Sequence, residues 1–123
     1  MTQTMTRTLY DRLGGGAGLR KIANDLVDAH LQNPTIAPRF GKSDPDTVKR
    51  LAHEFFAAGS GGTETYTGRD LRTIHGGMNV SEEEFVATVD DVMKVLLANG
   101  VGQREQEEVL AIFWALKGDV LRI

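Results

Sequence analysis

The chain has 123 residues, of which 41% are hydrophobic and 25% are charged, a balance that predicts one globular domain and argues against disorder or a fibrous repeat. Cysteine is absent, which excludes disulfides, thiolate metal sites and cysteine nucleophiles, and no apolar run approaches the roughly 18 residues of a membrane span. The formal net charge of −3 argues against general binding to nucleic acid. Residues 1–8 are polar and lack the apolar core of a signal peptide, so we expect a flexible tail, a single domain over residues 9–123 and a cytoplasmic location.

The first third of the chain predicts two helices and a single helical turn. Residues 9–13 form a short amphipathic segment that ends at three consecutive glycines. From about residue 18 to residue 32, apolar residues recur at three- and four-residue intervals, which predicts a helix with one buried stripe. Asn33-Pro34 ends that helix, and residues 35–40 are long enough for one helical turn only.

Two further helical segments are expected in the middle of the chain. Ser43-Asp44-Pro45 places a capping residue before a proline, which predicts a helix start, and this helix ends at the glycines of residues 59–62. A polar loop then leads to a brief segment over residues 69–75, which stops at Gly76-Gly77.

The last two helices have clear start or stop signals. Ser81 and Glu84 have the spacing of a capping box and predict a helix that ends at Asn99-Gly100. Apolar residues on one face predict a final helix over about residues 103–121. Because no run alternates apolar and polar residues over a useful length, we predict an all-α fold.

Histidine is the residue type here that points most directly to metal chemistry, and the chain has three: His30, His53 and His75. A lone histidine in a helix is more often a structural or surface residue than a ligand. His75 differs because it lies at the end of a very short helix with glycines on both sides. The helix propensity of so short a segment is too weak to hold it in place. A bond from its Nε2 atom to a metal ion would do so.

The order and spacing of several motifs resemble those of the group I truncated haemoglobins. The matching segments, which together span roughly residues 9–120, are Leu9-Tyr10-Asp11-Arg12-Leu13-Gly14-Gly15, Pro38-Arg39-Phe40, Phe55-Phe56-Ala57-Ala58 with Gly61-Gly62, Tyr66-Thr67-Gly68-Arg69-Asp70-Leu71, and His75 followed by Met78-Asn79-Val80-Ser81. The resemblance implies a two-over-two helical sandwich that binds haem b (iron protoporphyrin IX), with His75 on a short proximal helix as the iron ligand.

The resemblance also implies which residues surround the haem. The positions that match haem contacts of the family are Phe40, Val48, Ala52, Phe55, Phe56, Tyr66, Leu71 and Phe85. Each of them would also suit an ordinary helical core, so they indicate a haem site only together with His75. The haem propionates need cations at the pocket mouth, and the candidates by position are Lys42, Arg50 and Arg72.

The side of the pocket where a gas would bind departs from the family pattern. The family usually places a tyrosine on the second helix to hydrogen-bond bound O₂, and that position is Val27, with no tyrosine anywhere between residues 17 and 32. Its partner positions, often glutamine, are Val48 and Ala52. Together with Leu26, these three residues predict that the distal pocket, which is the side of the haem where a gas would bind, is apolar. Loss of a hydrogen bond worth about 1.5–3 kcal/mol would speed O₂ release by roughly 10- to 150-fold, and CO and NO binding would suffer less.

The other two histidines could change this expectation. His53 lies about 140° around the helical wheel from Val48, which favours a surface position. His30 lies one turn beyond Leu26 and is interpreted as a helix-end histidine near the negative end of the helix dipole. If either one reached the iron, the iron would be six-coordinate without an external ligand.

Three functions remain open at this stage. The first is a haem protein that reversibly binds diatomic gases (O₂, CO, NO), served by an unidentified reductase and present as a monomer or weak homo-oligomer. The second is an enzyme for NO dioxygenation or peroxide chemistry at the same haem, which the apolar pocket disfavours. The third is a helical interaction module that has lost haem, which the joint presence of His75 and Phe40 argues against.

Overall fold

Helices form nearly all of the architecture in the computed structural model, which describes residues 7–123. In chain order the elements are α1 (Leu9–Arg12), α2 (Gly15–Gln32), the 3-10 helix η1 (Ala37–Phe40), α3 (Pro45–Gly59), α4 (Leu71–His75), α5 (Glu82–Ala98), α6 (Gln103–Ala115) and the 3-10 helix η2 (Lys117–Asp119). Over the described range no β-strand occurs, and Val80 and Leu121 form an isolated parallel bridge. The predicted all-α fold is confirmed.

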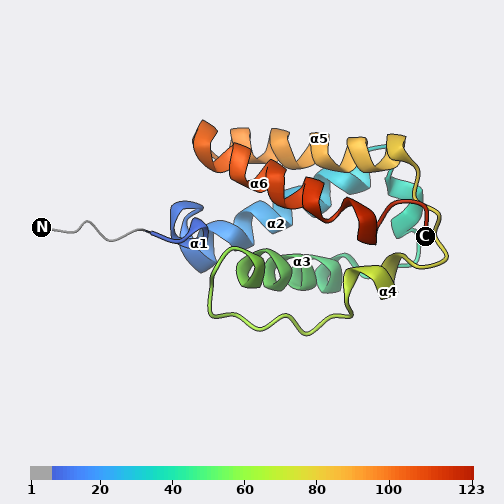
Figure 1. The fold of residues 1–123 in the computed structure, drawn as a ribbon, viewed down its shortest axis with the longest axis horizontal. Coiled ribbons are helices and arrows are strands. Elements are labelled where there is room, and N and C mark those ends of the chain that lie inside the picture. Colours follow the sequence, from blue (N-terminus) through green and yellow to red (C-terminus); the bar gives the residue numbers. More distant parts are fainter. Residues whose placement is uncertain (1–6) are drawn as a thin grey trace, which may run out of the picture.

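The four long helices pack as two pairs. Helix α2 packs against α3 and also against α5, and α5 in turn packs against α6. In Figure 1, α5 and α6 run side by side, α3 lies on the opposite side of the molecule, and α4 lies at the same end as the C-terminus. The core between the pairs is apolar, with Leu19 only 1% and Leu96 only 2% exposed. Burial of these apolar faces is what holds the short helices together.

Side-chain caps start three of the helices, and two of these caps, Asp44 and Ser81, were predicted. The Asp44 side chain accepts a hydrogen bond from the Thr47 backbone N–H, and the Asp70 side chain accepts one from the Thr73 N–H over 2.7 Å. Ser81 and Glu84 form the full capping box. These caps satisfy backbone N–H groups that would otherwise lack partners, so they fix the start of each helix.

Several boundaries differ from the sequence-based prediction. Helix α2 begins at Gly15 rather than near residue 18, because Gly14, with a φ of 102°, takes the left-handed conformation at its N-cap. Helix α6 ends at Ala115, and the chain then turns so that Arg122 N–H donates to Val80 O. Thr8, which we assigned to the N-terminal tail, caps α1. Residues 1–6 of that tail lie outside the described residues.

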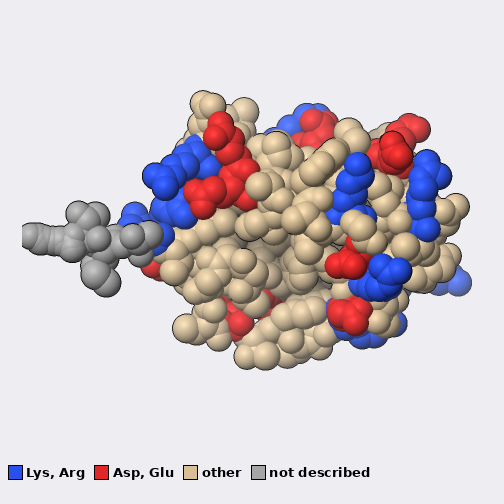
Figure 2. Space-filling view, viewed as in Figure 1, with Lys and Arg blue, Asp and Glu red and all other residues tan. Residues whose placement is uncertain are grey.

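The surface carries charges of both signs. On the face shown in Figure 2, basic and acidic side chains lie next to each other in small groups, and much of the middle of the face has neither. One such group joins Arg12 on α1 to Glu105 and Glu108 on α6. None of the helices within residues 7–123 combines the length and the apolar character needed to cross a membrane.

Candidate functional site

A cavity of about 610 Å³ opens between the helices and receives residues from every helix longer than five residues. This volume is within the range typical of small-molecule and cofactor sites. The cavity collects most of the predicted site residues, namely Leu26, Val27, Phe40, Val48, Ala52, Phe55, Phe56, Tyr66, Leu71, His75 and Phe85. Residues spread over about sixty positions of sequence therefore meet at one site.

His75 is held by its own short helix. Asp70 caps α4, and the imidazole Nδ1 of His75 lies 2.8 Å from the carbonyl oxygen of Leu71, one turn earlier. A carbonyl oxygen only accepts, so Nδ1 carries the proton and donates it. The tautomer is thereby set, and Nε2 is left with a free lone pair. His75 is half-buried and lines the cavity, so it is placed to offer Nε2 to a metal.

His30 lies in the last turn of α2, as expected, but it has a buried partner that was not expected. Its Nδ1 lies 2.8 Å from Oδ2 of Asp91 on α5, and both residues are 7% exposed. The amide of Asn33 donates to both Asp91 oxygens at 3.2 Å. The His30 ring stacks on Phe40, with centroids 6.1 Å apart, and lines the cavity.

His53 is buried, which contradicts the predicted surface position. It is 7% exposed, and its Nε2 lies 3.7 Å from an oxygen of Glu64 without a hydrogen-bond partner among the described residues. The loop after α3 runs back along that helix (Figure 1) and brings Glu64 to His53. His53 is not among the residues that line the large cavity.

Glu64 in this loop is held from the other side by Tyr10. The Tyr10 hydroxyl donates to Oε2 of Glu64 over 2.8 Å. This hydrogen bond lowers the pKa of Glu64 and raises the pKa of Tyr10. The loop is therefore fastened to α1, which holds Glu64 beside His53.

The three cations proposed at the pocket mouth do not line the cavity. Arg72 lies instead beside η2, where it donates to Gly118 O over 3.4 Å and is 3.7 Å from Asp119. Arg50 pairs with Glu54 at 3.1 Å. Lys42 is exposed. Arg50 and Arg72 are therefore held by partners that do not line the cavity.

Two arginines that the sequence analysis did not select do line the cavity: Arg39 and Arg69. Arg39 donates from Nε and Nη2 to Glu84 over 2.6 and 2.8 Å. This pairing lowers the pKa of Glu84 to about 2 and raises the pKa of Arg39. The motif Pro38-Arg39-Phe40 was a signal for Arg39, because it places the arginine directly before a residue of the cavity wall.

Tyr66 packs its ring against the cavity wall rather than standing free in a loop. The ring meets Phe55 edge-on with centroids 5.4 Å apart, and the hydroxyl donates to Arg69 O over 2.5 Å. Burial raises the pKa of Tyr66. A larger residue at Gly68 would collide with this hydroxyl, which lies beside the position that a Cβ atom would take.

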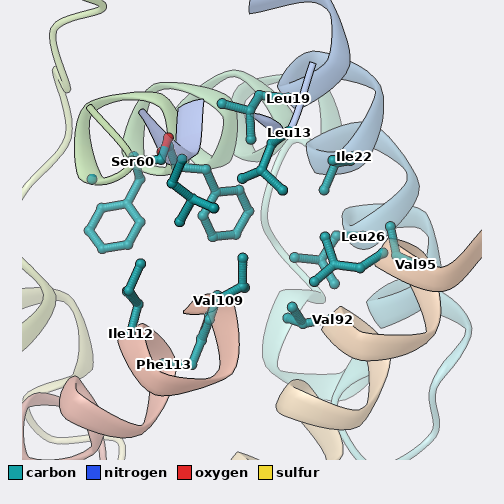
Figure 3. Close-up of a pocket in the computed structure, with 15 residues that line it drawn as sticks. Leu13, Leu19, Ile22, Leu26, Ser60, Val92, Val95, Val109, Ile112 and Phe113 are labelled. Atoms are coloured by element: carbon teal, nitrogen blue, oxygen red, sulfur yellow. The ribbon is translucent and has the colours of Figure 1, made fainter. Parts of the chain in front are cut away.

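A second, smaller cavity of about 50 Å³ lies in the core between the helix pairs (Figure 3). Its wall is apolar apart from Ser60, whose hydroxyl already donates to Phe56 O over 2.6 Å. The two cavities share Leu26, Phe55, Phe56 and Phe113 as wall residues. A thin layer of apolar side chains therefore separates them.

Comparison with known proteins places these features in a family. A profile of the family "Bacterial-like globin" matches residues 8–122. The chain is 32% identical to the group 1 truncated haemoglobin GlbN of Synechocystis sp., over 93% of this chain and 97% of that protein, and 26% identical to GlbN of Mycolicibacterium paratuberculosis, over 92% and 83%. Among solved structures, the truncated haemoglobin of Tetrahymena pyriformis in its Fe(III) form superposes with a TM-score of 0.91 at 22% identity, covering 95% of this chain and 100% of that one. The 2/2 haemoglobin of Synechococcus sp., a cyanomet form with covalently attached haem, gives 0.86 at 24% identity, over 94% and 98%.

Proposed function

Because this chain belongs to the bacterial-like globin family and is a group 1 truncated haemoglobin, we propose that it binds haem b in the large cavity and reversibly binds a diatomic gas there. The observation that carries the proposal is His75. Its Nδ1 donates a hydrogen bond to Leu71 O over 2.8 Å, so its Nε2 has the free lone pair that a metal ligand needs.

The residues of the cavity fit such a group. The space of about 610 Å³ is walled largely by aliphatic and aromatic side chains, with Phe40 and Phe85 among them. Apolar walls would exclude water from a bound macrocycle, and Nε2 of His75 would hold its iron. Arg69 on the same wall is the cation that could hold a carboxylate of the ligand, whereas Arg39 is already paired with Glu84. When bound, haem would supply a reducible iron with one open coordination position.

The chain's own residues set the selectivity among gases. Leu26, Val27, Val48 and Ala52 line the cavity and carry no hydrogen-bond donor on their side chains. A bound O₂ that carries partial negative charge gains from a donor, whereas CO and NO gain less. We therefore assign this protein weak O₂ retention relative to CO and NO, and a separate reductase as the source of electrons for the iron.

The first test is the absorption spectrum of the protein expressed with added haem, in the ferric form and after reduction with dithionite. A Soret band with a five-coordinate, high-spin ferrous spectrum is the expected result. Absence of a Soret band would overturn the proposed function. A six-coordinate, low-spin ferrous spectrum would show that a second side chain reaches the iron, which would contradict the open distal side.

A further inference from the structure

We propose that His30 and Asp91 form an acid–base pair on the cavity wall, which accepts the proton of a small weak-acid ligand, such as hydrogen cyanide or hydrogen sulfide, as its anion binds in the haem cavity. This inference rests on the proposed function and adds a second ligand class to it, since O₂, CO and NO carry no proton to remove.

The hydrogen bonds around His30 determine which ring nitrogen is available. Asp91 accepts from His30 Nδ1 at 2.8 Å and from the Asn33 amide at 3.2 Å. The carboxylate is thereby held in place, and Nδ1 of a neutral His30 carries the proton. No described residue bonds to Nε2, and the ring lines the cavity. Nε2 is therefore the basic atom that a molecule inside the cavity meets.

The buried carboxylate prepares His30 to accept a proton. In the neutral state His30 has a lone pair on Nε2 and its Nδ1–H donates to Asp91. A weak acid HX transfers its proton to Nε2, which yields X⁻ and an imidazolium with two N–H groups. One N–H continues to donate to Asp91, and the other faces X⁻. Because Asp91 is 7% exposed, its negative charge is poorly screened and stabilises the imidazolium.

The other ionisable groups of the cavity wall are already engaged. Arg39 on η1 pairs with Glu84 on α5. Asp44 at the start of α3 accepts from the Thr47 side chain and backbone. Tyr66 donates to a backbone carbonyl, as does Nδ1 of His75, and Arg69 remains cationic and cannot act as a base.

His53 provides a matched control. Like His30, it is 7% exposed and lies beside a carboxylate, here that of Glu64. Unlike His30, it does not line the large cavity. A substitution at either position removes a buried imidazole, but only the one at His30 removes a base from the cavity.

The experiment measures cyanide association with the ferric, haem-loaded protein by stopped flow between pH 5 and pH 9. At pH values below the pKa of hydrogen cyanide the ligand is present as HCN, so a base must accept its proton when the cyanide anion binds. We expect His30→Gln to slow association at least tenfold, since general base catalysis contributes roughly 10²–10⁴-fold. His53→Gln should leave the rate within about twofold of the wild type. CO association with the ferrous His30→Gln protein should be unchanged, because CO carries no proton.

Asp91→Asn tests the partner of His30 separately. Its amide oxygen still accepts from Nδ1, but the charge that stabilises the imidazolium is gone. We expect slower cyanide association than in the wild type, because the imidazolium that forms on proton transfer loses its charged partner. A profile that coincides with the wild type would overturn the role of Asp91.

The two proposals fail in different ways. Absence of a Soret band in the wild type overturns both. Normal haem loading with equal cyanide rates in His30→Gln and His53→Gln overturns only the acid–base pair. The haem-free protein gives an independent check, because ¹⁵N spectra should show neutral His30 with the proton on Nδ1. A proton on Nε2 would also overturn the pair.

Discussion

Arg39 and Glu84, which are 45 residues apart, are joined by two side-chain hydrogen bonds of 2.6 and 2.8 Å. Arg39 also donates to Met78 O at 3.0 Å. The contact ties η1 to the start of α5, and both residues line the large cavity. Stability of the site is therefore linked to the ionisation of one carboxylate.

This linkage predicts a specific pH dependence. The pKa of Glu84 is lowered from 4.5 to about 2, chiefly by the hydrogen bond from Arg39. A lowered pKa means that the folded state binds the proton less tightly than the unfolded state. The stabilisation is complete above about pH 4.5 and is lost as the pH falls through about 2. We expect Glu84→Gln to be less stable than the wild type at pH 7, with a smaller loss of stability between these pH values.

Urea unfolding at a series of pH values measures this effect. Glutamine at position 84 still completes the capping box with Ser81, so the substitution isolates the ion pair. Glu83→Gln, on an exposed neighbouring position of α5, is the control and should follow the wild-type profile. Identical profiles for Glu84→Gln and the wild type would contradict the linkage.

Removal of the His75 side chain should abolish tight haem binding. His75→Gly leaves the cavity wall otherwise intact but deletes the axial nitrogen, so we expect little haem to be retained after gel filtration. Free imidazole should restore the spectrum, because it replaces the missing ligand in the space that the side chain left. Haem retention and spectra like those of the wild type, without imidazole, would show that another residue is the ligand.

A tyrosine at position 27 should slow O₂ release. Val27 is 3% exposed and lines the cavity, so a phenol there would offer a donor to bound O₂. We expect release to slow at least several-fold, up to roughly 150-fold. Val27→Phe has nearly the same volume without the hydroxyl and separates hydrogen bonding from steric effects. Equal O₂ release rates in the two variants, measured by stopped flow, would show that the hydroxyl makes no such bond.

Adjacent leucines on α5 should differ sharply in their contribution to stability. Leu96 is 2% exposed and lines the small cavity, whereas Leu97 is 69% exposed. We expect Leu96→Ala to cost about 2–5 kcal/mol of unfolding free energy, because it enlarges an existing void. Leu97→Ala should stay within about 0.5 kcal/mol. Similar urea midpoints for the two variants would contradict the packing of α5.

Local signals in the sequence predicted most of the helices. The caps at Asp44, Asp70 and Ser81 each involve residues three positions apart, so their geometry follows from the chain itself. The prediction failed where a helix end depended on a distant segment. After α6 the chain pairs with residues around Val80, about forty positions earlier, rather than continuing as a helix.

In the candidate site, too, features that depend on neighbouring residues were predicted and features that depend on distant segments were missed. His75 and its position on a very short helix were evident from the neighbouring glycines and from the family resemblance. The burial of His53 was missed, because it depends on a loop that Tyr10 and Glu64 hold in place. A signal for Asp91 was present, since it lies one turn before the buried Val95 on α5, but nothing in its spacing identified a partner.

The sequence by itself therefore determined the all-α class and the starts of α3 and α5, because these depend on periodicity and on contacts within a few residues, and the order and spacing of its motifs indicated the family. Only the tertiary structure decided that Asp91 meets His30 across 61 positions and that Arg39, rather than Arg72, lines the cavity. Such pairs depend on how helices cross and on which side chains their packing brings together. Those crossings are set by burial of the whole apolar surface, which no local spacing encodes.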